Sequence, residues 1–274
     1  MDNLLYFYQH LPLYLNPTLK IGLFSVSYYS LMYILAFAVV YFLLIHRIRK
    51  KETEIFSKSS LVDFLLYCFI GLLIGARLGE VIFYNFSYYW QNPLAVISPF
   101  DPATHEFIGI YGMSYHGGLI GIIIVSYFFI RKYKIDFWQL SDFIIPAIPA
   151  GYFFGRIGNF INNELYGRVT AKPWGMYFKD YPFELRHPSQ LYEAFFEGIV
   201  LFLFLWALRN KKQFQGNFLA LYLIGYGFFR FICEFFREPD VTSGFLFRYI
   251  TLGQWFSIIM VIAGAIIIAL RRKN

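Results

Sequence analysis

The stretch GRIGNFINNELYGR, residues 155–168, closes an apolar run that begins near residue 140 and is long enough to cross a membrane. It places two arginines, one glutamate and three asparagines at the end of that run. An arginine inside a membrane costs roughly 2.5–3.5 kcal/mol on insertion scales, so some partner must offset it. The stretch therefore predicts a membrane helix that ends in a polar, functional region.

The composition is typical of an integral membrane protein. Hydrophobic residues make up 58% of the 274 residues and charged residues only 15%, whereas a soluble domain carries about 25% charged residues. The chain also contains 34 Phe and 23 Tyr, many of them at the ends of apolar runs, as in interfacial aromatic belts. The net charge of +7 does not indicate a nucleic-acid partner, because the basic residues lie in short tracts between apolar runs.

Apolar runs of about 20 residues predict an all-α integral membrane protein with a seven-helix transmembrane bundle. The whole chain, 1–274, is expected to form a single membrane domain. The expected spans are 22–45, 61–84, 115–130, 140–161, 189–208, 217–236 and 251–270. The outer loops 85–114 and 162–188 are expected to form a small extracytoplasmic head region. The Tyr- and Leu-rich N-terminal segment is expected to lie in the membrane interface.

Basic residues predict the orientation of the spans. The first, third and fifth connections and the C-terminus hold most of them: Arg47, Arg49, Lys50, Lys51, Lys58, Arg131, Lys132, Lys134, Arg209, Lys211, Lys212, Arg271, Arg272 and Lys273. The positive-inside rule places these connections in the cytoplasm. The N-terminus is therefore expected outside and the C-terminus in the cytoplasm.

With this topology, the polar residues of the spans gather in the outer half of the membrane. Outward-running spans end with Arg77, Glu80, Arg156, Asn159, Arg230 and Glu234, and inward-running spans begin with Tyr29, Ser114, His116, Ser189, Gln190, Tyr192, Glu193 and Gln254. Helical spacing places Arg156 and Asn159 on one helix face. Arg230 and Glu234 share a face for the same reason. The asymmetry predicts a polar chamber open toward the outer leaflet, although each arginine alone could be a structural ion pair.

Glycines and cysteines favour structural roles. Gly71, Gly75 and Gly79 recur at every fourth residue of the second span, a spacing that favours close helix packing. A phosphate-binding loop is a poor interpretation, because no strand precedes these glycines. Cys68 and Cys233 each lie in an apolar run and are expected to be small buried hydrophobes. Their spacing does not predict a metal site, and the sequence indicates no cofactor.

The segment GRIGNFINNELYG, residues 155–167, resembles the signature of the prolipoprotein diacylglyceryl transferase family. Further segments agree in order along the chain: YYSLMY at 28–33, GMSYHGGLIG at 112–121, RHPSQLYE at 186–193, GFFRFICEFFREPD at 227–240 and LGQW at 252–255. Ser30 and Asn163 depart from the family's more frequent glycine, and the connection 168–188 is short for the family.

The resemblance implies transfer of the sn-1,2-diacylglyceryl group from phosphatidylglycerol to the cysteine thiol of a prolipoprotein lipobox. The products would be a thioether and glycerol-1-phosphate. The partners would be phosphatidylglycerol, the signal peptide that carries the lipobox, and membrane lipid, in a bacterial plasma membrane. Displacement at an sp³ carbon needs a thiolate nucleophile and a charge-neutralised phosphate leaving group, and neither requires a metal.

The resemblance also assigns roles to residues. Arg156 and Arg230 are expected to contact the phosphate, because a planar guanidinium donates two parallel hydrogen bonds. The expected head-group site also includes Asn159, Glu164, Gly167, Glu234 and Arg77. Glu234 could orient Arg230 or serve only as its salt-bridge partner. Gly167 could instead follow a turn that needs a positive φ.

Two further residues are expected at the reacting groups. His116 is the candidate base for the thiol, since imidazole is commonly neutral near pH 7 and can accept a proton. The alternative is that His116 only hydrogen-bonds a helix end. Tyr29 is expected to orient the lipid head group or this histidine.

The main alternative function is a transporter or flippase of an anionic lipid, which would also place arginines inside a helical bundle. Transporters usually hold their site near the midplane and contain repeats. The polar residues of this chain are displaced outward and the sequence contains no convincing repeat. An acyltransferase and a binding-only membrane module are weaker alternatives.

Overall fold

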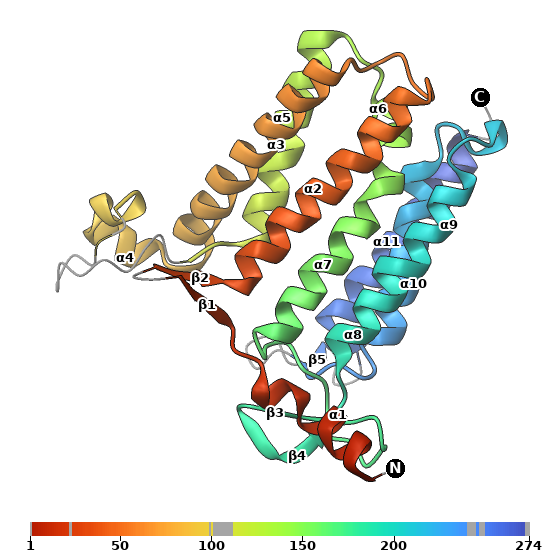
Figure 1. Ribbon diagram of the computed structural model, residues 1–274. Coiled ribbons are helices and arrows are strands. Elements are labelled where there is room, and N and C mark those ends of the chain that lie inside the picture. The colour runs from red at the N-terminus through yellow and green to blue at the C-terminus, as the bar shows by residue number, and fades with distance from the viewer. Residues whose placement is uncertain are drawn as a thin grey trace. The chain divides into compact units, whose positions relative to one another are not determined.

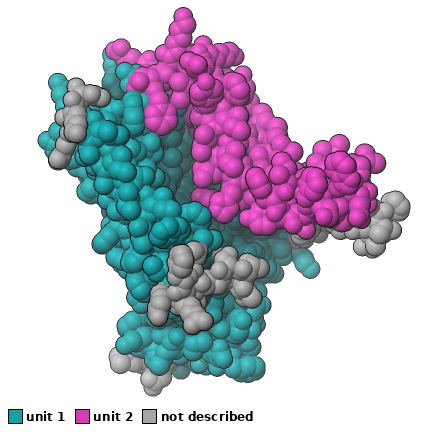
Figure 2. Space-filling view, turned by 180° about the vertical axis from the view of Figure 1, so that it is seen from behind, with its two compact units in different colours: residues 1–52, 138–274 teal, residues 53–137 magenta. Residues whose placement is uncertain are grey.

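The computed structural model is mostly helical and describes residues 2–21, 24–98, 100, 112–239, 245–246 and 250–271. The chain divides into two compact units, one formed by residues 1–52 with 138–274 and the other by residues 53–137 (Figure 2). The larger unit carries the signature stretch and both chain ends.

Long helices dominate the larger unit (Figure 1). The described helical segments of this unit are α1 Asp2–Tyr14, α2 Tyr28–Arg49, α6 Phe137–Ile144 (its first residue belongs to the smaller unit), η3 Ile145–Ala147, α7 Ile148–Ile161, α8 Ser189–Glu193, η4 Ala194–Val200, α9 Leu201–Leu208, η5 Lys212–Phe214, α10 Phe218–Cys233 and α11 Leu252–Arg271. Its strands pair in three antiparallel hairpins: β1 Thr18–Ile21 with β2 Phe24–Ser27, β3 Met176–Phe178 with β4 Tyr181–Arg186, and β5 Phe245–Leu246 with β6 Ile250–Thr251.

The smaller unit is built on two helices that cross closely. Its described segments are α3 Lys58–Gly79, η1 Glu80–Tyr84, α4 Phe86–Gln91, η2 Pro93–Val96 and α5 Tyr115–Tyr133. A Cβ at Gly75 would lie 2.4 Å from the carbonyl oxygen of Gly117 on the partner helix. Only glycine allows the backbones of α3 and α5 to approach this closely, so the expected packing role of these glycines is confirmed.

Four helical stretches in the described part of the chain are long and apolar enough to cross a membrane: Tyr28–Arg49, Lys58–Tyr84, Ser189–Leu208 and Leu252–Arg271. The shorter helix Phe218–Cys233 is also apolar. The count of seven spans stays a prediction.

The first long helix begins later than residue 22, where the expected span began. The preceding residues pair as strands, with Val26 opposite Leu19. The hydroxyl of Ser27 then accepts the N–H of Tyr29 at 3.2 Å and caps α2. An apolar run alone does not distinguish such a strand from a helix.

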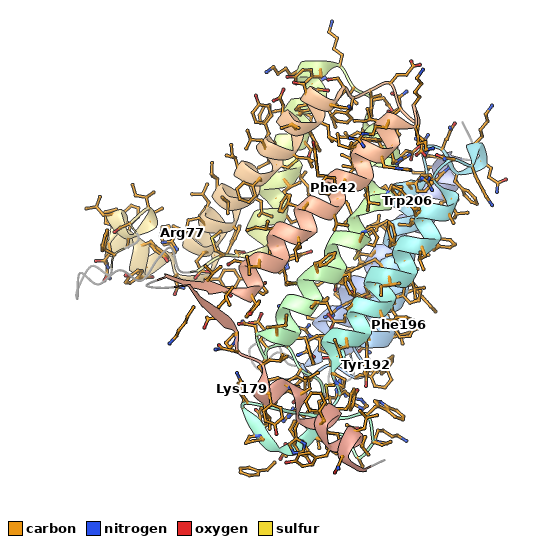
Figure 3. All side chains as sticks on the ribbon, viewed as in Figure 1. Phe42, Arg77, Lys179, Tyr192, Phe196 and Trp206 are labelled. Atoms are coloured by element: carbon orange, nitrogen blue, oxygen red, sulfur yellow. The ribbon has the colours of Figure 1, made fainter. Side chains whose placement is uncertain are left out.

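One end of the larger unit carries a small head made of α1 and the β3–β4 hairpin (Figure 1). The side chain of Asn163 donates to the carbonyl oxygen of Pro12 at 3.0 Å. The hydroxyl of Tyr8 donates to the carbonyl oxygen of Trp174, also at 3.0 Å. Met176 and Phe178 are buried beneath α1. Figure 3 shows Lys179 and Tyr192 at this head end and Trp206 near the opposite end of the same unit.

Ion pairs and hydrogen bonds of charged side chains connect the helices at the opposite end of the larger unit. The guanidinium of Arg47 donates to the carbonyl oxygens of Asp142 and Phe143 at 2.8 and 2.6 Å. It also pairs with Glu52 at 2.8 Å, and Glu52 lies 3.3 Å from Arg209. Burial raises the pKa of the Glu52 carboxyl, but hydrogen bonds from Asn210 and Arg47 and the charges of Arg47 and Arg209 outweigh burial, so the pKa is lowered.

Candidate active site

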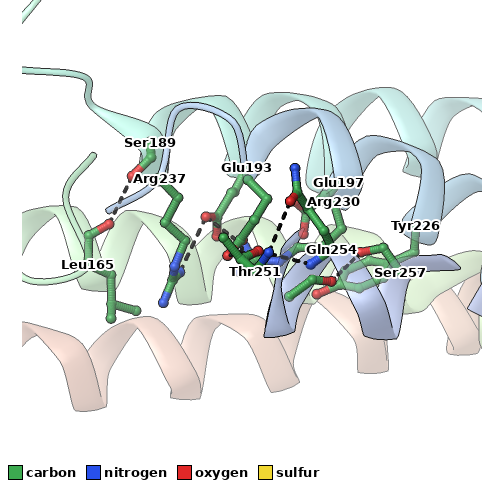
Figure 4. A network of polar contacts seen from close by, with 12 residues as sticks. Leu165, Ser189, Glu193, Glu197, Tyr226, Arg230, Arg237, Thr251, Gln254 and Ser257 are labelled. Carbon is green, nitrogen blue, oxygen red and sulfur yellow. Dashed lines mark hydrogen bonds and ion pairs between the residues drawn. The ribbon is translucent and has the colours of Figure 1, made fainter. Parts of the chain in front are cut away.

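The two arginines of the predicted phosphate site, Arg156 and Arg230, meet at one carboxylate, Glu193. Figure 4 shows Glu193 with Arg230 and Arg237 beside it. Nε of Arg156 lies 2.8 Å from Oε2 of Glu193, and Nη1 of Arg230 lies 2.8 Å from Oε1. Glu193 is fully buried. Three helical segments, α7, α8 and α10, therefore converge on one ion-paired centre in the larger unit.

The position of Glu193 follows from how α8 begins. The hydroxyl of Ser189 donates to the carbonyl of Leu165 at 2.9 Å, and the side chain of Gln190 donates to that of Glu164 at 2.6 Å. Both side chains are fully buried. They fasten the first turn of α8 to the loop of the signature stretch, which places Glu193 beside α7.

Arg230 has a second carboxylate partner. Its Nη2 lies 2.6 Å from Oε2 of Glu234, one helical turn further along the chain. The hydroxyl of Thr251 donates to Oε1 of Glu234 at 3.0 Å, which connects this pair to the start of α11. Arg237 adds a third guanidinium, 3.4 Å from Glu193. The expected Arg230–Glu234 pair is thus present.

The signature loop forms a chain of hydrogen bonds that starts at Arg156. Nη1 of Arg156 donates to Oδ1 of Asn159 at 3.3 Å, and Nδ2 of Asn159 donates to Oε1 of Glu164 at 2.7 Å. Asn163 and Leu165 adopt positive φ angles of 58° and 59°, which turn the chain after α7. Asn159 and Glu164 therefore adjoin Arg156, as the sequence predicts.

Gly167 is needed for close approach of backbones. A Cβ at this position would lie 2.3 Å from the carbonyl oxygen of Phe236 and 2.7 Å from Cβ of His187. The N–H of Gly167 donates to the carbonyl of His187 at 2.8 Å. Its φ is not positive, so the alternative that this glycine serves a positive-φ turn is wrong.

Tyr29 packs against the helix that carries Arg156. A Cβ at Gly158 would lie 3.2 Å from Cδ2 of Tyr29, so the tyrosine ring lies against α7. Its hydroxyl lies 3.1 Å from that of Tyr33. Tyr29 belongs to the larger unit with Arg156, and its role toward a substrate stays a prediction.

His116 and Arg77 belong to the smaller unit, whereas all other predicted site residues belong to the larger one. Arg77 donates to the carbonyl oxygens of Val96 and Ala95 at 2.7 and 2.6 Å. Its guanidinium also lies over the ring of Tyr89, 4.9 Å from the centroid. His116 is exposed near the start of α5, one residue beyond Tyr115.

Tyr152 and Glu197 also belong to this centre, although neither is among the predicted site residues. The hydroxyl of Tyr152 donates to Oε2 of Glu197 at 2.5 Å and accepts Nε–H of Arg156 at 2.6 Å. The fully buried Glu197 lies in the π-helical segment η4, directly after α8. Two acidic residues four positions apart, Glu193 and Glu197, inside an apolar run were the available signal, because such residues are rarely placed in a membrane without a function.

His187 lies at the head end of this site, outside the membrane-spanning segments. Its Nδ1 lies 3.0 Å from the hydroxyl of Tyr192, and its ring packs edge-on against Phe236. Burial, with a smaller effect of Lys172, lowers the pKa of His187. The neutral imidazole is therefore favoured at the junction of β4 and α8.

A model of the prolipoprotein diacylglyceryl transferase family matches residues 17–270. The chain belongs to this family. It is 49% identical over 261 residues to the phosphatidylglycerol–prolipoprotein diacylglyceryl transferase of Chlorobaculum tepidum, which covers 94% of this chain and 90% of that protein. Proteins of the same name from Bordetella parapertussis and Rickettsia bellii are 46% and 44% identical, over 90% and 93% of this chain and 91% and 94% of their own. The chain is thus a multi-pass membrane protein of a bacterial transferase family.

Proposed function

We propose that this chain transfers the sn-1,2-diacylglyceryl group of phosphatidylglycerol to the lipobox cysteine of a prolipoprotein. The family and its named relatives support this activity. The observation that carries it on the structural side is the convergence of Arg156 and Arg230 on the buried carboxylate of Glu193. Their guanidinium groups are thereby held a short distance apart, as recognition of one phosphate requires.

Arg156 is the arginine suited to bind the phosphate directly. Its Nε is held by Tyr152 and Glu193, and its side chain keeps 15% exposure. No described group accepts a hydrogen bond from its Nη2. Nη1 donates one of its two N–H groups to Asn159, so Nη1 and Nη2 together can still donate two parallel bonds to phosphate oxygens.

Arg230 differs, because each of its Nη groups already faces a carboxylate. We assign it the role of adding positive charge beside the fork of Arg156. Such fixed charge stabilises the leaving phosphate most in a site that excludes water. Asn159, Glu164 and Gly167 would then shape the loop around the head group, and Glu234 would hold Arg230.

The reaction breaks the bond between the glyceryl carbon and its phosphate oxygen. The cysteine thiolate attacks that carbon and forms the thioether, and the phosphate leaves as glycerol-1-phosphate with its negative charge facing the arginines. The thiol proton needs an acceptor, for which we keep His116 as the prediction from the family resemblance. We assign Arg77 a supporting role, since it holds the carbonyl oxygens of Ala95 and Val96.

The proposal extends to topology. Seven spans with the N-terminus outside and the C-terminus in the cytoplasm would put the Glu193 centre in the outer half of the membrane. Two observations support this orientation. The helix α8, which carries Glu193, lies toward the head end of the larger unit, and α9, which ends directly before Arg209, runs toward its other end (Figure 1).

The deciding experiment incubates the purified chain with phosphatidylglycerol and a lipobox peptide. We expect the mass of one diacylglyceryl group to appear on the peptide cysteine, with release of one glycerol-1-phosphate per adduct. A peptide with serine in place of the cysteine is the control. Movement of lipid across a vesicle membrane without any adduct would favour the flippase alternative instead.

A further inference from the structure

Tyr152 and Glu197 form a buried pair beside the fork of Arg156. Neither lies in the sequence segments that resemble the family. Tyr152 contacts Arg156 twice, through its hydroxyl at 2.6 Å and through its ring, whose centroid lies 4.8 Å from the guanidinium carbon. Glu197 contacts the other side of that hydroxyl.

We infer that Tyr152 and Glu197 are positioning residues that fix the plane of the Arg156 guanidinium, an inference that rests on the proposed transfer reaction. A guanidinium is planar, so a hydrogen bond from Nε and a ring beneath the carbon together set the direction of both Nη groups. The geometry thus assigns to Tyr152 and Glu197 the role of directing both Nη groups of Arg156 toward the phosphate oxygens.

The direction of the hydrogen bonds supports the assignment. A phenol has one proton, and the oxygen of Tyr152 already accepts the N–H of Arg156. Its own proton is therefore directed to Glu197, and the hydroxyl of Tyr226 donates to the same phenol oxygen at 3.4 Å. A carboxylate acceptor polarises the phenol and strengthens its hold on the guanidinium.

Glu193 does not replace Tyr152 in this role. Oε2 of Glu193 lies 2.8 Å from Nε of Arg156, yet it accepts no hydrogen bond within the described part of the chain, because the N–H points at Tyr152. The Glu193 carboxylate is also shared with Arg230 and Arg237. Glu193 contributes negative charge beside Arg156, whereas the hydrogen bond with Tyr152 sets the orientation of the Arg156 guanidinium.

The placement of Glu197 is costly unless it serves such a role. Its side chain is fully buried, and its Oε1 has no hydrogen-bond partner among the described residues. A buried carboxylate with one unpaired oxygen is unfavourable and calls for an explanation. Holding the hydroxyl of Tyr152 against Arg156 provides one.

The test measures turnover and Tm of the purified full chain with two sets of variants. Tyr152→Phe keeps the ring and removes the hydroxyl, so we expect kcat/KM for phosphatidylglycerol to fall roughly tenfold, the effect of one hydrogen bond to a charged group. The KM for the lipobox peptide and the Tm should stay near the parent values. Tyr41→Phe, the same change elsewhere in a long helix, is the control.

The second set changes the carboxylate. Glu197→Gln keeps an acceptor oxygen and should retain more activity than Glu197→Leu. Because the two residues act as one unit, Tyr152→Phe combined with Glu197→Leu should lose no more than the worse single variant. Glu54→Gln, on an exposed connection, is the matched control.

Four results would overturn the inference. The activity of Tyr152→Phe could equal that of the parent. Alternatively, Tyr152→Phe could lower kcat/KM for both substrates and also lower the Tm. The two losses could also multiply in the double variant, which would mean independent roles. If Tyr152→Phe does not fold, equal activity of Glu197→Gln and Glu197→Leu decides against the inference. A parent chain that forms no thioether would instead reject the proposed function itself.

Discussion

Ion pairing explains how single arginines persist in a mostly apolar chain. Arg156 and Arg230 would each be costly in a membrane, but the buried carboxylate of Glu193 lies within 2.8 Å of both. Removing one partner of such a buried pair costs about 3–5 kcal/mol. The two arginines nevertheless differ, since Arg230 places both of its Nη groups beside carboxylates, whereas Arg156 approaches Glu193 through Nε.

Replacing these arginines by lysine tests the need for a planar fork. Arg156→Lys keeps the positive charge but loses the planar fork. Arg230→Lys also keeps the charge but cannot bridge Glu193 and Glu234 through two Nη groups, which misplaces that charge. We therefore expect each variant to lower turnover roughly a hundredfold or more. Adduct formation on the lipobox peptide is the measurement. Arg49→Lys, at an exposed position, should behave like the parent. Unchanged turnover of Arg156→Lys would reject the bidentate role of Arg156, and unchanged turnover of Arg230→Lys would reject the supporting role of Arg230.

At the scale of elements, the α3–α5 pair depends on contact between backbones. Gly75 and Gly117 face each other so closely that their helices have no room for a side chain. Gly118, on the same turn of α5, differs, because a Cβ there would meet its neighbours at an ordinary 3.5 Å. The two positions allow a matched comparison.

We expect Gly75→Ala to destabilise the protein by about 1–3 kcal/mol, because the added methyl group must push α3 and α5 apart. Gly118→Ala should leave stability nearly unchanged. Thermal unfolding of both variants in the same detergent is the measurement. Equal Tm values for the two variants would contradict the backbone-contact interpretation.

At the scale of the whole molecule, the proposed orientation makes opposite ends of the larger unit accessible from opposite sides of the membrane. Phe183 in the head is 93% exposed, and Lys211 follows α9 at the other end. The native cysteines, Cys68 and Cys233, are buried and unpaired, as the sequence indicates. They should contribute little background to a labelling experiment.

Intact cells treated with a membrane-impermeant maleimide should label Phe183→Cys but not Lys211→Cys. Permeabilised cells should label both variants, which controls for the reactivity of the second site. Labelling of Lys211→Cys in intact cells would contradict the proposed orientation. It would mean that the Glu193 centre lies toward the cytoplasm.

Much of the helical architecture was predictable because the length and hydropathy of a run are local properties of the chain. The runs that predicted spans fall on helical segments such as α3, α5 and α11. The start of the first span was misplaced, since Phe24–Ser27 lies within the expected span but pairs with Thr18–Ile21 as a strand. Pairing of that kind depends on a second segment, which a single run does not reveal.

The sequence by itself determined the family, the positions of the long helices and the identity of the costly residues Arg156 and Arg230, because each follows from a motif or from a charge within an apolar run. Only the tertiary structure decided that Glu193 joins these arginines and that Tyr152 and Glu197 hold one of them. The physical reason is that contacts between helices depend on how each helix is rotated about its axis. That rotation is set by packing along the whole bundle, and residue spacing within one helix does not contain it.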